Sequence, residues 1–422
     1  MTRPIGIDLF AGAGGLSLGF EQAGFDVVAA VEIDPIHCAV HKFNFPQTAT
    51  ICKSVTELTG DELRRRAGIG NRDIDVVFGG APCQGFSLIG KRAFDDPRNQ
   101  LVYHFVRLVI ELEPKHFVFE NVKGLTVGNH RRFLQEIIAA FQEGGYNVVS
   151  DYQVLNAADY GVPQDRRRLF LMGAHDGAKL PEYPKPIGRA TVREAISDIP
   201  DAQTLLELWH RDWTKAKFGK PSTYAAMLRG KKDDPHDYGY RRIYDPSILT
   251  SSLLTEHTTL SRERFAATCP GDVEPVSRFK KLDLDGICNT LRAGTASDRG
   301  AFTSPRPIHP TVPRVITVRE AARLHSYPDW FRFHVTKWHG FRQVGNSVPP
   351  LLARAVAGQI IAALRKKPEK PANAIGLGDV SLLGISMSAA AAMFGVSETV
   401  IAKRSRQDRQ AQNEEGKESV AA

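Results

Sequence analysis

The sequence predicts an α/β fold, in which a mostly parallel sheet carries helices on both faces. Three observations lead to this prediction. Short apolar runs alternate with amphipathic stretches over residues 1–175, a glycine-rich turn separates the first apolar run from the first amphipathic stretch, and no internal repeat is present. Such alternation is typical of parallel strands joined by crossover helices. The carboxyl ends of those strands share one edge of the sheet, and we expect ligands to bind there.

The elements of this first domain follow from the spacing of its apolar side chains. Continuous apolar runs predict buried strands at residues 4–10, 27–33, 74–78, 116–120 and 169–173. Apolar side chains at helical spacing predict helices at residues 16–23, 35–44, 101–112 and 131–141.

Beyond residue 175 the alternation fades, which indicates a second, less regular domain over residues 176–330. Prolines, glycines and basic residues are interleaved there with the aromatic side chains of Trp209, Trp213, Phe218, Tyr224, Tyr238 and Tyr240. Later segments predict a helix at 318–324, a turn at 345–350 and a hydrophobic helix at 350–364, with Asn346 or Ser347 as its cap. We expect residues 331–365 to return to the first domain and complete it.

Residues 366–422 form a tail whose role the sequence leaves open. A charged linker with prolines at 365–371 leads into it. Residues 386–406 predict a helix, a turn at 394–397 and a second helix, which is the pattern of a small helix-turn-helix. A solvent-exposed helical tail or a dimer contact fits the pattern equally well. Residues 407–422 are polar, and we expect them to fray.

Composition and charge narrow the class of protein. Of the 422 residues, 42% are hydrophobic and 24% are charged, which excludes collagen-like, coiled-coil and largely disordered chains. The net charge of +8 favours an anionic partner, nucleic acid first. No apolar run predicts a membrane span, and the N-terminal residues do not suit a secretory signal. The five cysteines lack CxxC spacing, so we expect a cytoplasmic protein without a disulfide framework or a metal site.

A glycine-rich loop follows the first predicted strand. Residues 10–15 read FAGAGG, and glycines let a backbone turn tightly and approach a ligand closely. Glu32 ends the next strand, about twenty residues on, where an acceptor for ribose hydroxyls is expected. The combination predicts a cofactor that contains adenosine, either a dinucleotide or S-adenosylmethionine (AdoMet). ATP is not expected, because the loop lacks the Gly-Lys-Ser/Thr of a phosphate-binding loop.

Cys83 lies just beyond the strand predicted at 74–78, in the segment GGAPCQGFS. A free cysteine is most often a buried structural thiol. Here, however, proline and glycine flank the residue at the edge of the sheet where ligands are expected. Lys91, Arg92 and Arg98 follow in the same loop, and nearby cations favour a reactive thiolate. We therefore predict that Cys83 is a functional thiol and not a structural one.

Two later segments bring charged side chains to the same edge. Glu120 ends the strand at 116–120, where an apolar pocket would keep its carboxyl protonated and able to donate a proton. The alternative is that Glu120 caps the next helix. Arg166, Arg167 and Arg168 lead into the strand at 169–173. Alternation along a strand puts Arg166 and Arg168 on one face and Arg167 on the other, although a solvated basic stripe would have the same sequence.

Taken together, these segments resemble the DNA cytosine-5 methyltransferases of bacterial restriction–modification systems. The resemblance runs in the family's order from residue 4 to about residue 364 and leaves the tail uncovered. Its segments are DLFAGAGG, the strand end at Glu32, GGAPCQGFS, FENV, NAADYGVPQDRRR, VREAARLHSYPD and QVGNSVPP. It implies a Rossmann-like, AdoMet-dependent methyltransferase sheet in the catalytic domain. It also implies that the smaller, irregular 176–330 region is a target-recognition domain.

The resemblance also implies roles for individual residues. Cys83 would be the nucleophile, Glu120 would bind the target cytosine at ring nitrogen 3, and Arg166 and Arg168 would position the base. AdoMet would be held by Phe10, Gly12, Ala13, Gly15, Glu32, Ile33, Ser54, Val55, Pro82, Leu101 and Asn346. Contacts to DNA would come from Ser87, Lys91, Arg92, Arg98, Gln164, Thr290 and Leu291. Arg319 and Glu320 would be structural.

One residue departs from the pattern of that family. Ser54 stands where the family usually has an aspartate that accepts a hydrogen bond from the adenine amino group. A serine oxygen is a weaker acceptor than a carboxylate. Adenine recognition would therefore depend more on backbone and apolar contacts.

The implied reaction moves a methyl group from AdoMet to carbon 5 of a cytosine flipped out of duplex DNA, through a covalent adduct with Cys83. The loop at 85–99 would close over the flipped base. Two alternatives share the scaffold, namely methylation of cytosine in tRNA and a catalytically silent DNA-binding regulator. A cognate restriction endonuclease is an implied partner. The sequence leaves open which DNA sequence is recognised and whether the chain is a monomer or a dimer.

Overall fold

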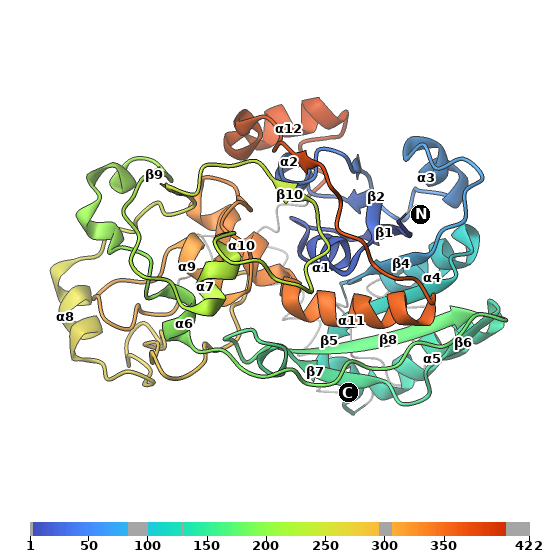
Figure 1. Ribbon diagram of the computed structural model, residues 1–422, viewed down its shortest axis with the longest axis horizontal. Coiled ribbons are helices and arrows are strands. Elements are labelled where there is room, and N and C mark those ends of the chain that lie inside the picture. Colours follow the sequence, from blue (N-terminus) through green and yellow to red (C-terminus); the bar gives the residue numbers. More distant parts are fainter. Residues whose placement is uncertain (1–2, 83–99, 129, 295–305, 402–422) are drawn as a thin grey trace, which may run out of the picture.

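The computed structural model describes residues 3–82, 100–128, 130–294 and 306–401 (Figure 1). Its main sheet has the order β3-β2-β1-β4-β5-β8-β6, with β7 paired to β8. The strands are β1 Ile5–Leu9, β2 Asp26–Glu32, β3 Ala49–Cys52, β4 Val76–Gly79, β5 His116–Val122, β6 Tyr146–Val148, β7 Gln153–Asn156 and β8 Arg167–His175. Strands β1 to β5 are parallel, whereas β8 pairs antiparallel with β5, β6 and β7. The predicted α/β sheet is confirmed, and the short strands β3, β6 and β7 are additions that the sequence did not predict.

Helices cover both faces of this sheet, as predicted. Helices α4 (Gln100–Leu112) and α5 (His130–Glu143) pack on one face, in a core that is continuous with Val77 and Leu171. Helices α1 (Gly15–Ala23) and α11 (Pro350–Ala363) lie side by side on the other face (Figure 1). The remaining helices of this part are α2 Pro35–Asn44, α3 Gly60–Arg66, η3 Lys123–Thr126 and η4 Ala157–Asp159. Among the described residues, no helix is both long enough and apolar enough to cross a membrane.

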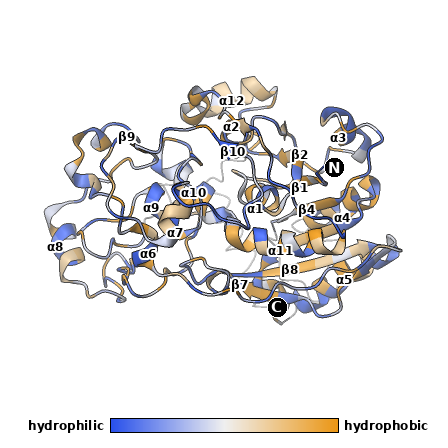
Figure 2. Cartoon of the chain, viewed as in Figure 1, coloured by the Kyte–Doolittle hydropathy of each residue, from blue (hydrophilic) through white to orange (hydrophobic). Residues whose placement is uncertain are grey.

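The register of the strands brings several chain segments to one edge of the sheet. Leu9 at the end of β1 pairs with Val31 on one side and with Gly79 on the other, and Gly79 pairs with Phe119. Figure 2 shows β8, the neighbour of β5, coloured largely toward the hydrophobic end of the scale. The segments that follow β1, β2, β4 and β5 therefore emerge next to one another.

Residues 176–294 and 306–317 form a less regular lobe, most of which lies on the left of Figure 1. Its elements are short: α6 Val192–Ile196, η5 Ala202–Thr204, η6 Leu206–Trp209, β9 Thr214–Lys215, α7 Thr223–Leu228, β11 Ile248–Leu249 and α8 Thr259–Ala267. Two small apolar clusters lie within it, around Leu208 and Leu249 and around Phe265 and Ile308. The irregular character predicted for this region is confirmed.

One stretch of that region packs on the first domain instead. Arg242 is buried and forms an ion pair with Glu21 of α1, at 2.8 Å between Nη2 and Oε2. Strand β10 (Arg241–Arg242) pairs with β12 (Ala374–Ile375), which comes from the tail. Residues 231–244 therefore lie on the surface of the first domain, although the sequence placed them in the second.

The segment before α11 differs from its prediction. Residues 345 and 346 belong to a helix, α10 (Lys337–Asn346), where the sequence predicted only a turn. Its Phe341 and Val344 are buried and pack with the preceding helix α9 (Val318–Leu324). Helix α11 begins after Pro349 without any side-chain cap. The Ser347 hydroxyl instead donates to the Val344 carbonyl at 2.8 Å, because it lies at the end of α10.

The tail also differs from its prediction. It contains η9 (Val380–Gly384) and α12 (Met387–Phe394), and α12 ends at Gly395 with a positive φ of 67°. Residues 396–401 are not helical, and the rest of the predicted second helix lies outside the described residues. Helix α12 and η9 both pack against α2 (Figure 1). The first helix and the turn are confirmed, but α12 is docked on the first domain and is not a free helical tail.

Candidate active site

The glycine loop between β1 and α1 has positive φ values and close contacts of the kind that favour glycine. Phe10 has a φ of 65° and Gly12 a φ of 56°, so the chain turns sharply as it leaves β1. A Cβ on Gly15 would lie 2.5 Å from the Val348 carbonyl oxygen and 2.7 Å from the Tyr327 hydroxyl. Residue 15 can therefore pack as closely as it does against Val348 and Tyr327 only because it has no side chain.

Glu32 holds this loop to the end of β2. Its Oε2 accepts a hydrogen bond from the Gly12 amide at 2.8 Å. Its Oε1 accepts from the amides of Ile33 and Asp34, both at 2.9 Å. A carboxylate oxygen has about two acceptor sites, so Oε1 is saturated while Oε2 keeps one free. Glu32 can thus shape the loop and still accept a hydroxyl from a ligand.

A cavity of about 630 Å³ opens in front of the loop. Its volume lies within the range of small-molecule and cofactor sites. Every residue predicted to hold the cofactor lines it, namely Phe10, Gly12, Ala13, Gly15, Glu32, Ile33, Ser54, Val55, Pro82, Leu101 and Asn346. The structure thus gathers these residues from β1 through α10 around one space.

Glu120 and Arg168 line the same cavity and form an ion pair. Arg168 Nε lies 2.9 Å from Glu120 Oε1, because β5 and β8 pair with Val122 opposite Arg168. Burial raises the pKa of the Glu120 carboxyl, and the positive charges of Arg168 and Arg166 only partly oppose this effect. A carboxyl with a raised pKa can hold a proton and donate it to a ligand.

Gly80 leaves the room that Glu120 needs. A Cβ on Gly80 would lie 2.5 Å from Glu120 Oε2. The next residues are held close by Asn121, whose Nδ2 donates to the Ala81 carbonyl at 2.9 Å. The chain that leaves β4 is therefore fixed against the acidic end of β5 as far as Pro82.

The whole arrangement can be compared with known proteins. A family model described as C-5 cytosine-specific DNA methylase matches residues 5–362, which span every segment of the cavity apart from Ile401. The chain belongs to this family. It therefore transfers a methyl group from AdoMet to carbon 5 of cytosine in DNA.

Individual relatives agree with this assignment. The methyltransferase is 80% identical over 406 residues to the Type II methyltransferase M.XorII of Xanthomonas oryzae pv. oryzae (strain KACC10331 / KXO85), covering 96% of each chain. It is 37% identical to the Type II methyltransferase M1.HphI of Haemophilus parahaemolyticus, over 84% of this chain and 86% of that one. A crystal structure of a DNA modification methyltransferase encoded within an E. coli prophage covers 86% of this chain and 100% of its own, with a TM-score of 0.70 and 35% identity. The S. pombe Dnmt2 methyltransferase covers 86% of this chain and 99% of its own, and with 16% identity and a TM-score of 0.51 it shares the fold alone.

Five residues predicted at the site lie outside the described residues of the methyltransferase. They are Cys83, Ser87, Lys91, Arg92 and Arg98. The described chain reaches Pro82, which lines the cavity together with Glu120. Position 83 therefore follows directly on a cavity residue.

The structure gives Arg166 a different place from Arg168. Arg166 is fully buried, and its guanidinium donates to the carbonyls of Leu291, Gly345 and Ser347 at 2.7 to 2.8 Å. Burial lowers its pKa, and the charge of Arg168 adds to that effect. Arg166 does not line the cavity, and its bonds join β8 to the chain at Leu291 and at 345–347, whereas Arg168 lines the cavity beside Glu120. Arg167 is exposed, as the alternation predicted.

The described residues predicted to touch DNA lie mostly inside the protein. Gln164 is fully buried, and its amide Nε2 bonds to the Leu324 carbonyl at 3.2 Å and to His325 Nδ1 at 2.9 Å. Its Oε1 accepts from the Leu291 amide at 3.1 Å, and Leu291 is itself buried. Thr290 is half-buried and donates to the Asp165 carbonyl at 2.6 Å. Gln164 and Leu291 are thus placed to join the lobe to the catalytic domain, and their contact with DNA stays a prediction.

Several cavity residues were not found from the sequence. They are chiefly Asp34, His37, Lys53, Arg342 and Ile401. Asp34 caps α2, and its Oδ2 accepts from Arg342 Nη1 at 2.7 Å. The Asp-Pro pair at the start of α2 is a local signal that could have pointed to Asp34. Arg342 comes from α10, more than three hundred residues later, and no local pattern indicates it.

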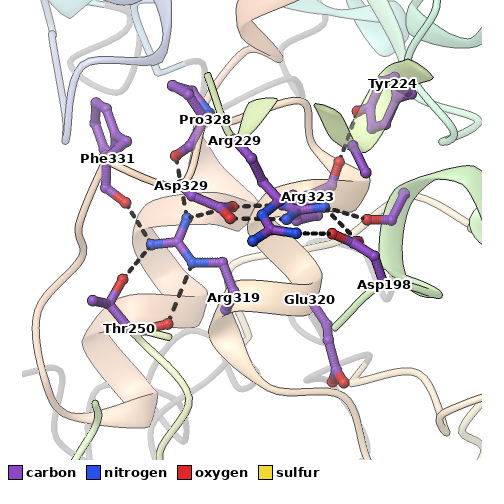
Figure 3. Close-up of polar contacts among 12 residues, drawn as sticks. Asp198, Tyr224, Arg229, Thr250, Arg319, Glu320, Arg323, Pro328, Asp329 and Phe331 are labelled. Atoms are coloured by element: carbon purple, nitrogen blue, oxygen red, sulfur yellow. Dashed lines mark hydrogen bonds and ion pairs between the residues drawn. The ribbon is translucent and has the colours of Figure 1, made fainter. Parts of the chain in front are cut away.

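A buried ionic network docks the lobe on helix α9 (Figure 3). Arg323 of α9 forms ion pairs with Asp198, at 3.1 Å, and with Asp329. Arg229, which follows α7, also pairs with Asp198 at 3.1 Å. Arg319 donates to the Thr250 hydroxyl at 2.7 Å and to the Phe331 carbonyl at 2.7 Å. The structural role predicted for Arg319 fits these contacts. Glu320 pairs with Arg314 at 2.7 Å and closes the capping box of α9 with Thr317.

Proposed function

We propose that Glu120, Arg168 and Cys83 carry out the methylation of a flipped cytosine in a specific duplex DNA sequence, beside AdoMet in the 630 Å³ cavity. The observation that supports this proposal is that two groups of residues line the same cavity. The glycine loop with Glu32 forms one part of the lining, and the Glu120–Arg168 pair with Pro82 forms another. A cofactor and a base held by these two groups would lie next to each other.

The cavity lining suits AdoMet. We assign the free acceptor site on Glu32 Oε2 to a ribose hydroxyl, since the Gly12 amide takes only one of its two sites. The apolar side chains of Ile33, Val55 and Leu101 offer faces for the adenine ring. Ser54 Oγ already interacts with the Thr56 hydroxyl at 2.7 Å, so it is a shared and weak acceptor for the adenine amino group.

The base-binding role of Glu120 follows from its raised pKa and its partner. A protonated Glu120 can donate to ring nitrogen 3 of cytosine and draw electron density from the ring. Arg168 fixes the carboxyl in the orientation for that hydrogen bond. The thiolate of Cys83 would then add to carbon 6, which makes carbon 5 nucleophilic. AdoMet, when bound, supplies a methyl group on a positively charged sulfur.

Loss of the carbon-5 proton and expulsion of the thiolate would complete the cycle and restore the aromatic ring. The expelled sulfur carries away the electron pair of its bond to carbon 6. A base must leave the stack to reach such a site, at a cost of a few kcal/mol. The loop at 85–99, which the sequence predicted to close over the base, lies outside the described residues.

We also propose that the chain is a Type II enzyme with a target site shared with M.XorII. Their 80% identity extends over 96% of both chains and therefore includes the irregular lobe. Target choice in DNA-binding proteins depends on contacts to base edges, and the lobe is the part of this chain that such contacts would come from. A cognate restriction endonuclease and a cytoplasmic location belong to the same proposal.

The test is methyl transfer from labelled AdoMet to duplex DNA and, in parallel, to tRNA. We expect label in DNA that contains the M.XorII site and none in DNA without it. Cys83→Ser should abolish transfer while AdoMet still binds. Label in tRNA alone would support the RNA alternative, and DNA binding without any transfer would support a silent regulator.

A further inference from the structure

The chain beyond the family model contains a folded extension, residues 374–401. The family model ends at residue 362, so the extension is not part of the common scaffold. Leu382 and Leu383 of η9 are buried in one cluster with Val40 and Phe43 of α2, and Phe394 of α12 packs against that cluster. Leu382, Leu383 and Phe394 thus pack against the catalytic domain and hold the extension in position there.

Backbone contacts also hold the extension in place. The Gly378 amide donates to the Phe43 carbonyl at 2.8 Å, and the Val335 amide donates to the Leu383 carbonyl at 2.9 Å. A Cβ on Gly378 would lie 2.9 Å from Phe43 Cα, so the two chains approach as closely as they do only because residue 378 is glycine. The pairing of β12 with β10 adds a further attachment.

The helix to which the extension is anchored also forms part of the cofactor cavity. Asp34, which caps α2, and His37 in its first turn both line the cavity. At the other end of the anchored segment, Gly395 adopts a left-handed conformation and the Val396 amide donates to the Ala391 carbonyl at 3.0 Å. The chain then runs from this turn to Ile401.

Ile401 lines the cavity itself. It is half-buried and is the cavity residue that lies outside the range of the family model. The rest of the lining combines apolar side chains, among them Val55 and Leu101, with glycines and with charged and polar groups. An isoleucine there adds apolar surface that a bound ligand can cover, which favours binding in proportion to the area removed from water.

We propose that Ile401 is a cofactor-contacting residue and that the extension forms an outer wall of the AdoMet site. This proposal rests on the proposed function, because it places AdoMet in this cavity. The contact adds affinity for AdoMet without taking part in the chemistry. By linkage, AdoMet bound against Ile401 in turn stabilises residues 396–401 in their docked position.

The experiment compares Ile401→Asp and Ile401→Val with a matched control, Val380→Asp, in the full-length protein. Val380 is an apolar residue of the same extension that is 60% exposed and does not line the cavity. We expect Ile401→Asp to raise the Kd and KM for AdoMet about tenfold with kcat and the KM for DNA unchanged. Ile401→Val and Val380→Asp should stay within about twofold of wild type.

Hydrogen exchange of the 396–401 backbone gives an independent readout. We expect AdoMet to slow exchange there in the wild type and to slow it less in Ile401→Asp. The proposal is overturned if Ile401→Asp binds AdoMet as tightly as Val380→Asp does, or if AdoMet leaves exchange at 396–401 unchanged. A wild-type protein that binds no AdoMet, by contrast, would contradict the proposed function itself.

Discussion

Glu120 and Arg168 form an ion pair across two strands, with 2.9 Å between Oε1 and Nε, at the wall of the cofactor cavity. The pair depends on the antiparallel register of β5 and β8, which places Val122 opposite Arg168. Removing one partner of a buried pair leaves the other charge without compensation, which is costly. The pair is therefore a structural unit, and single substitutions in it are best made isosteric.

Glu120→Gln should reduce kcat by about a hundredfold or more. A glutamine keeps the shape and can still donate a hydrogen bond, but it cannot give up a proton to ring nitrogen 3, and general acid catalysis contributes typically 10²–10⁴-fold. The Kd for AdoMet should change little, because in the proposed arrangement the substituted atoms contact the base and not AdoMet. Single-turnover methylation and equilibrium binding measure the two quantities. Asp285→Asn, in the exposed pair with Arg193, is the control and should leave both unchanged.

Gly80→Ala tests whether the space beside Glu120 matters. The added Cβ would lie 2.5 Å from Glu120 Oε2 and would force that carboxyl away from its position. Since misplacement by about 1 Å can cost about a hundredfold in rate, we expect kcat to fall about 10- to 100-fold. Gly358→Ala is the matched control, because a Cβ there meets nothing within 4 Å in α11. That variant should keep full activity and gain about 0.5–1 kcal/mol of stability. Equal activity of the two variants would show that the space beside Glu120 does not affect the rate.

The parts of the site that could be predicted from the sequence depend on local signals. The glycine loop, Glu32 and Glu120 each lie at a strand end, and a parallel sheet brings strand ends together whatever the rest of the chain does. The alternation of Arg167 and Arg168 is likewise a local consequence of strand geometry. These assignments needed no knowledge of distant contacts.

The parts that could not be predicted depend on long-range packing. Arg166 looks like Arg168 in sequence, yet its partners at Leu291 and Ser347 decide that it is a buried clamp. Gln164 is polar and was assigned to DNA, but its three hydrogen bonds are made by groups more than a hundred residues away. The docking of α12 on α2 and the position of Ile401 in the cavity lining also depend on contacts between residues far apart in the sequence.

Asp8 should make stability depend on pH. Asp8 is a fully buried residue of β1, and its Oδ2 accepts a hydrogen bond from the Ser17 hydroxyl at 2.6 Å. Burial raises the pKa of its carboxyl to about 8. The folded state thus holds a proton that the unfolded chain loses near pH 4. The contribution of Asp8 to the free energy of unfolding is therefore fully present below about pH 4, and it is lost as the pH rises through about 8.

The measurement for Asp8 is denaturant unfolding of the wild type and Asp8→Asn at pH 6 and pH 8.5. An asparagine stays neutral at both values. We expect the free energy of unfolding to fall by on the order of 2 kcal/mol more in the wild type than in the variant over this range. A parallel decrease in both proteins would show that Asp8 does not hold its proton in the folded state.

Arg323→Met should destabilise the fold far more than loss of a surface ion pair. Arg323 is fully buried. It bonds to Asp198, to Asp329 and to the Ala195 carbonyl, and these bonds join the lobe to α9 (Figure 3). Methionine fills similar space but leaves two buried carboxylates with fewer partners, and breaking such a pair costs about 3–5 kcal/mol. Arg193→Met removes an exposed pair with Asp285 and should cost less than about 1 kcal/mol. Urea titrations of both variants decide the matter, and similar midpoints would show that the network does not stabilise the docking of the lobe.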